Sequence, residues 1–139
     1  EQFPMFPPDR YSERCPWDKR WTLERWISDR VLRLSCTADD MRPLGEAAGW
    51  HGHPARVGPQ HGQDARATVH KWNPRERAEL AAELDAAFFL LYGVERADAE
   101  YILSTFSGAG RDDREIGLFS PVEGVLNAYD RLAAAASGE

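Results

Sequence analysis

Apolar side chains recur at helical spacing through most of the chain. Between residues 21 and 34 they follow the i, i+3, i+4 pattern of a single helix face. The members of this stripe are Leu23, Trp26, Ile27, Val31 and Leu34. The arginines of the same segment fall largely off the stripe, and they are Arg20, Arg25, Arg30 and Arg33. The pattern predicts an amphipathic helix.

The segment from Trp72 to Gly93 carries the clearest helix signals. Asn73 is a favourable N-cap, Pro74 suits the first helical position, and Gly93 is a natural C-terminal stop. An apolar stripe runs along it through Leu80, Leu84, Phe88 and Leu91. We expect Leu84 and Phe88 to be its most buried side chains, and we expect Glu83, off the stripe, to tolerate replacement.

Three further segments have helical patterns. Thr37 has the spacing of a capping box, which predicts a short helix ending near Gly49. Residues 96–106 form another helix, with Tyr101, Ile102 and Phe106 as its apolar positions. Ser120 and Pro121 begin a last helix, whose apolar face comprises Val122, Val125, Leu126, Tyr129 and Leu132. Because no segment alternates with period two, the prediction is an all-α fold, a small irregular bundle of about five short helices.

Two segments interrupt this pattern and set the predicted organisation. Residues 1–18 form a proline- and aromatic-rich arm that we expect to be extended and to pack on something, as the end of a missing recognition region. Residues 19–139 form the helical C-terminal domain. Inside it, residues 50–70 show no regular spacing of apolar residues. A short sequence that begins with His-Gly and contains Ala-Arg occurs there twice in similar form, which favours a low-complexity insertion.

The composition indicates what kind of protein this is, but it does not indicate a function. The net charge is −6, which is unlike a free-standing nucleic-acid binder. Lys19 and Lys71 are the only lysines among 17 basic residues, a bias that we attribute to GC-rich coding more than to phosphate binding. The two cysteines are far apart in sequence, no signal-peptide pattern occurs, and no apolar run reaches the ~18 residues of a membrane span. A cytoplasmic protein without membrane contact is expected.

Several residue groups are of types that can carry out catalysis or bind a metal. None of them is assigned a catalytic, cofactor-binding or metal-binding role. The four histidines are His51, His53, His61 and His70, and we interpret them as incidental to the insertion, although a His-x-His pair is a usable zinc ligand set. The acidic pairs Asp39-Asp40 and Asp112-Asp113 fit helix starts and solvated loops. Cys15 and Cys36 lack the signature of a catalytic cysteine, and Trp21 and Trp26 are expected to pack in the core instead of stacking on bases.

Five strings, in order, resemble one family. They are FPMFPP at 3–8, RVLRLSCTA at 30–38, AAELDAAFFLLYG at 81–93, YILSTF at 101–106 and NAYD at 127–130. Together they resemble the extreme C-terminus of large adenine-specific DNA methyltransferases of restriction-modification and phage-defence systems. The resemblance covers nearly all of the chain outside residues 50–70. Leu91 stands where the family has histidine, and the basic stretch that usually follows Phe106 is altered here.

The resemblance implies a non-catalytic C-terminal segment that packs on the methylase and target-recognition regions of a parent protein. In such a parent, S-adenosylmethionine is the methyl donor and DNA is the partner. The Asn/Asp-Pro-Pro-aromatic loop of the family is missing here, because Pro7-Pro8 is preceded by Phe6 and followed by Asp9. The alternatives are a free-standing helical interaction module of a defence operon and a degenerate gene remnant, with a zinc-dependent enzyme as a weaker third. The sequence by itself names no DNA target.

Overall fold

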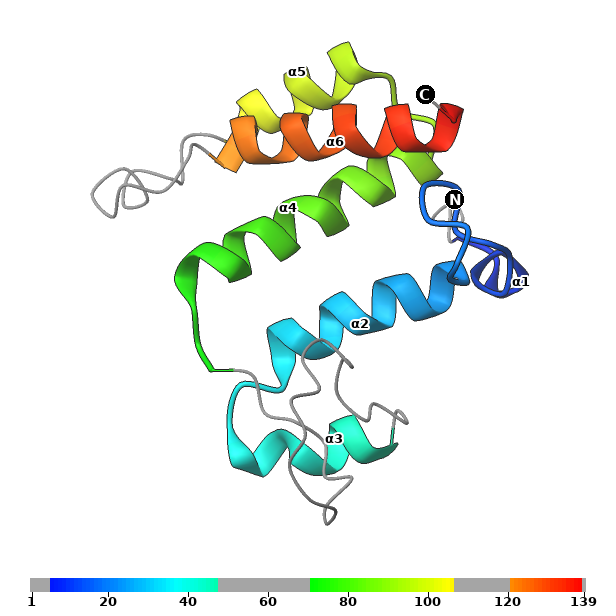
Figure 1. The fold of residues 1–139 in the computed structure, drawn as a ribbon. Coiled ribbons are helices and arrows are strands. Elements are labelled where there is room, and N and C mark those ends of the chain that lie inside the picture. Colours follow the sequence, from blue (N-terminus) through cyan, green and yellow to red (C-terminus); the bar gives the residue numbers. More distant parts are fainter. Residues whose placement is uncertain (1–5, 48–70, 107–120, 139) are drawn as a thin grey trace, which may run out of the picture.

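The computed structural model describes residues 6–47, 71–106 and 121–138, and its regular elements are helices (Figure 1). In chain order they are α1 (Pro8–Tyr11), α2 (Leu23–Ser35), the 3-10 turn η1 (Asp39–Met41), α3 (Arg42–Ala47), α4 (Pro74–Leu91), α5 (Arg96–Phe106) and α6 (Pro121–Ser137). Over these ranges no strand is present, and one isolated bridge joins Arg14 to Thr22. The predicted all-α fold is confirmed.

Helix α4 lies in the middle of the arrangement, between α2 on one side and α6 on the other (Figure 1). Helix α5 packs on α6, so that α6 separates α5 from α2. The short helix α1 contacts α2. Since α4 makes the main contacts with both α2 and α6, it positions the two halves of the fold.

Local capping explains where the longer helices begin and end. The Thr22 side chain caps α2 by accepting from the Arg25 amide, and Asn73 caps α4 by accepting from the amides of Arg75 and Glu76. Gly93 has φ of 68°, a left-handed conformation that glycine adopts without steric cost. The Val94 amide donates to Phe89 O at 2.9 Å and the Gly93 amide to Leu90 O at 3.1 Å, which is the Schellman pattern. The ends of α4 at Asn73 and Gly93 were correctly predicted from the sequence, whereas the Thr22 cap of α2 was not.

The face that α4 buries differs from the predicted one. Ala86 and Ala87 are completely buried and Ala82 is nearly so, whereas Leu84 and Phe88 are half-buried. Small side chains let α6 approach closely: a methyl group placed on Gly124 would lie 3.7 Å from Ala82 Cβ. The expectation that Leu84 and Phe88 are the most buried residues is wrong, because the interface selects small side chains over large ones.

The stripe predicted on α2 also needs correction. Leu23 and Trp26 are buried as expected, but Val31 is 44% exposed and Leu32, off the stripe, is 7% exposed. Arg30 and Arg33, expected off the buried face, turn toward α4, with side chains 16% and 25% exposed. The helix is therefore rotated so that arginines occupy part of its inner face.

The N-terminal arm packs on the helices of this chain. Phe6 meets Tyr11 and Tyr92 edge-on, with ring centroids 5.4 and 5.9 Å apart. Trp17 packs against Trp26 at 5.2 Å, and Cys15 is fully buried in the same core. The arm is interrupted by the single turn of α1, which Pro8 begins at a position where its missing amide costs nothing. Phe6, Tyr11 and Trp17, the aromatics of the arm that the structure describes, thus find packing partners within this chain.

The remaining predictions have mixed outcomes. The helix expected after Thr37 is split into η1 and α3, and Gly49 lies outside the described residues. On α5 the buried residue is Ala99, while Tyr101 is 71% exposed against expectation. On α6, Val125, Leu126 and Leu132 are buried as predicted. The whole of the predicted insertion, residues 50–70, and the altered stretch after Phe106 also lie outside the described residues.

The alanine interface between α4 and α6 generates a stability prediction. Ala86→Leu inserts three carbon atoms where no free surface exists, and overpacking of this kind typically costs about 1–3 kcal/mol. Ala81 lies on the exposed side of the same helix, so Ala81→Leu is a matched control that we expect to change unfolding by less than about 0.5 kcal/mol. Chemical denaturation followed by circular dichroism measures both. Equal effects of the two variants would show that α4 buries a different face.

Candidate functional site

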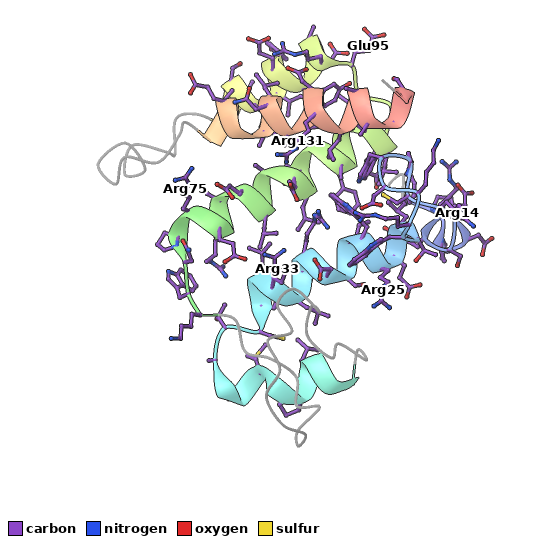
Figure 2. All side chains as sticks on the ribbon, in the orientation of Figure 1. Arg14, Arg25, Arg33, Arg75, Glu95 and Arg131 are labelled. Carbon is purple, nitrogen blue, oxygen red and sulfur yellow. The ribbon has the colours of Figure 1, made fainter. Side chains whose placement is uncertain are left out.

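Charged side chains fill much of the space between α2 and α4 (Figure 2). Five residues from three helices make up this cluster, which we call the ionic junction. They are Arg30 and Arg33 of α2, Glu76 and Glu83 of α4, and Arg131 of α6. Figure 2 shows Arg33 on the side of α2 toward α4, and Arg131 on the side of α6 toward α4.

Glu83 connects the three helices through one carboxylate. Its Oε2 accepts from Arg30 Nε at 2.8 Å, and its Oε1 accepts from Arg131 Nη2 at 2.5 Å. Arg30 also donates from Nη1 to Trp26 O at 3.1 Å, and its guanidinium lies 3.4 Å from the Trp26 ring centroid. Because Arg30 is thus stacked and hydrogen-bonded, its direction toward Glu83 is fixed.

The second half of the junction joins the end of α2 to the start of α4. Arg33 donates from Nη2 to Glu76 Oε1, while its Nε is buried without a hydrogen-bond partner. Arg77, one residue beyond Glu76, donates from Nη1 to the Leu34 carbonyl at 2.5 Å. That carbonyl belongs to the last turn of α2, where an arginine interacts favourably with the negative helix end.

Asp29 is the buried charged residue of this region, with 7% of its surface exposed. Its Oδ2 lies 4.0 Å from Arg30 Nη1 and 3.8 Å from Arg33 Nη1. A carboxylate in such surroundings is stable only beside compensating positive charge. The arginines of α2 therefore serve both Asp29 within the helix and the glutamates across the interface.

The ionic junction is suited to holding helices together. Every carboxylate in it is engaged by a guanidinium, and the guanidinium of Arg30 is itself stacked on an indole. Sequence patterning missed the junction because the ion pairs join residues such as Arg30 and Glu83 that are 53 positions apart. The only local signal was the presence of arginines on a helix whose apolar stripe was incomplete.

The residues considered from sequence do not converge on one site. Cys15 and Cys36 are buried free thiols, and burial raises the pKa of the Cys15 thiol, which packs as a small apolar side chain. Asp40 is exposed beside η1. The four histidines and the Asp112-Asp113 pair lie outside the described residues. Among the residues that the structure describes, no group of three potential metal ligands gathers.

The Pro7-Pro8 pair does not fit a methylase cofactor or base-binding loop. Pro7 is the residue before α1, Pro8 begins that helix, and Phe6 packs against Tyr11 and Tyr92. A loop that holds a flipped adenine needs an open pocket and a polar side chain for the amino group. Since the prolines here start a helical turn on a packed aromatic cluster, no step of methyl transfer is derived from them.

Large side chains that remain exposed mark the outer surface. Trp72 is 65% exposed just before α4, and Tyr101 is 71% exposed on α5. Leu44 of α3 and Val31 of α2 are each nearly half exposed. No helix in the described part of the chain is both long and apolar enough to cross a bilayer. Exposed aromatics of this size are the usual anchors of binding surfaces.

Removing Glu83 tests the ionic junction. Glu83→Ala leaves Arg30, whose side chain is 16% exposed, without its carboxylate, and we expect a loss of about 1–3 kcal/mol. The sequence expectation that Glu83 tolerates replacement is revised accordingly. Glu79→Ala is the matched control, since Glu79 pairs with Arg75 at the surface and should cost less than about 0.5 kcal/mol. Urea denaturation at low and high salt measures the free energy of unfolding of both variants. Equal losses of stability in the two variants would show that the ionic junction does not stabilise the fold.

Comparisons with known proteins do not assign the chain to a family. No protein-family model, curated protein or solved structure matches the chain. The resemblance to methyltransferase C-termini stays a prediction that rests on the strings themselves. The structure adds their location: AAELDAAFFLLYG runs along α4 to Gly93, YILSTF lies on α5 and NAYD lies on α6, which packs on both α4 and α5.

Proposed function

We propose that this chain is the non-catalytic C-terminal segment of an adenine-specific DNA methyltransferase of a restriction-modification or phage-defence system. In this proposal its helices pack on the methylase and target-recognition regions of the parent protein. S-adenosylmethionine, bound elsewhere in the parent, supplies the methyl group. No residue of this chain is assigned to the cofactor or to the flipped base.

The observation that carries the proposal is the order and placement of the resembling strings. Three of them fall on consecutive helices, and they include the contacts that join these helices. Ala86 and Ala87 of the α4 string are fully buried, and the Tyr129 hydroxyl of the α6 string donates to the Val94 carbonyl at 2.9 Å. Asp130, next to it, pairs with Arg96 Nε at 2.8 Å. The strings thus coincide with side chains that hold α4, α5 and α6 together, and this supports a shared framework of packed helices.

A docking role suits the exposed aromatic and aliphatic side chains. Val31, Leu44, Trp72 and Tyr101 stand on four different segments, so no single small ligand would cover them. Contact with larger domains would cover several of them at once, as obligate domain interfaces do. This distribution supports a segment that packs against other protein regions more than it supports a compact catalytic site.

The proposal predicts where catalysis resides. The chain alone, incubated with DNA and labelled S-adenosylmethionine, should transfer no methyl group above background. A continuous reading frame upstream should encode an Asn/Asp-Pro-Pro-aromatic loop, and the protein made from the whole frame should methylate adenine. Deleting residues 19–139 from that protein should lower its stability or activity.

Two outcomes would contradict it. Methyl transfer by the isolated chain would place catalysis here. A start codon or stop codon directly upstream, with no methylase frame, would instead favour the free-standing helical module. Reading about one kilobase of flanking DNA distinguishes these cases before any protein is made, since a catalytic domain of ~200 residues needs several hundred base pairs.

A further inference from the structure

Trp72 stands at the surface immediately before α4, at the end of the molecule where α4 begins beside the end of α2 (Figure 1). It is 65% exposed, although tryptophan is usually buried over most of its surface. Its neighbours Lys71, Asn73 and Arg75 are exposed as well. Asn73 is committed to capping α4 through the amides of Arg75 and Glu76. The backbone that presents the indole is therefore anchored.

Arg77 holds the exposed ring in place. The guanidinium of Arg77 lies 3.9 Å from the centroid of the Trp72 ring, and Nη1 of the same group donates to Leu34 O at 2.5 Å. A stacked guanidinium that is also fixed to a backbone carbonyl restrains the indole without burying it. The ring thus has little freedom to lose when a flat ligand stacks on it.

Three basic residues, Lys71, Arg75 and Arg77, stand within five positions of Trp72, in contrast to the net charge of −6 of the whole chain. The nearby carboxylates of Glu76 and Glu79 are paired with Arg33 and Arg75. Lys71 has no ion pair with any described residue, and the Arg75–Glu79 pair is exposed on both sides, at 73% and 65%. Surface pairs of this kind are weak in water, so a phosphate can compete for Arg75. An aromatic ring flanked by Lys71, Arg75 and Arg77 matches a strand of alternating flat bases and phosphates.

Other surfaces fit this ligand less well. Tyr101 is more exposed than Tyr92, but it follows Glu100 and lies on the helix of Asp98, which would repel phosphate. Arg10 of α1 lies over the Phe6 ring and Arg25 of α2 lies over the Trp21 ring, but both rings are only partly exposed, whereas Trp72 is 65% exposed. The region around Trp72 is thus the one described surface that combines an exposed, restrained ring with available cations.

We propose that Trp72, Lys71 and Arg75 form a contact site for single-stranded nucleic acid. One unpaired base stacks on the indole, and the flanking phosphates lie against Lys71 and Arg75, with Arg77 orienting the ring. The proposal does not rest on the function proposed above, because it follows from this end of α4 alone.

Binding is measured with the whole chain and a fluorescein-labelled oligothymidine of about 12 nucleotides, by anisotropy. Trp72→Ala should weaken binding about 5- to 150-fold, and Trp72→Phe should restore part of it, because any aromatic ring can stack. Lys71→Glu should weaken binding and lower its salt dependence. With two phosphate contacts, affinity should fall roughly 7-fold between about 50 and 200 mM salt.

Tyr101→Ala is the matched control, an exposed aromatic in acidic surroundings whose loss should leave affinity unchanged. Melting curves check that Trp72→Ala folds like the unaltered chain. No binding to oligothymidine would overturn the proposal and turn attention to a protein partner. Equal affinity for a duplex of the same length, unaffected by Trp72→Ala, would also overturn it, since phosphates alone would then account for binding. Neither result depends on whether a methylase frame lies upstream.

Discussion

The close approach of α4 and α6 through small side chains is the constraint on which the rest of the fold depends. Ala82, Ala86 and Ala128 are buried between the two helices, and Gly124 adds a position without a side chain. Two helices at this separation leave no room for large residues along the contact line. Most of the large apolar side chains of α4, among them Leu84, Phe88 and Phe89, are therefore only partly buried, whereas Leu80 is buried.

This arrangement leaves the opposite side of α4 to be covered by α2, and charges mediate much of that contact. Trp26 supplies the apolar part, and Arg30, Glu83 and Arg131 supply a connection that spans three helices. Arginine suits this position because its planar fork can stack on an indole and hydrogen-bond a carboxylate at the same time. A partly ionic interface favours one register, since a rotation of α2 would carry Arg30 away from Glu83 and Arg33 away from Glu76.

The two proposals concern different regions of the fold. The strings that resemble methyltransferase C-termini coincide with the joints of α4, α5 and α6, so what they encode is a framework of packed helices. The nucleic-acid contact is proposed at the free end of α4, where Trp72 is restrained by Arg77 and remains outside the core. The framework and the contact site share α4 but use opposite ends of it.

The sequence by itself determined the helical class and the limits of its best-marked helices. Asn73, Pro74 and Gly93 specify the ends of α4 through local hydrogen bonds and φ preference, which act within a few residues. Thr22 begins α2 in the same way, although the stripe alone did not single it out.

Only the tertiary structure decided which faces are buried. Hydrophobic periodicity ranks positions by side-chain size, so it favoured Phe88 over Ala86, whereas the distance between α4 and α6 rewards the smallest residues. It also placed Arg30 and Arg33 outside, because their carboxylate partners come from a helix more than 40 positions away. The rotation of α2 follows from these long-range contacts, which no local pattern contains.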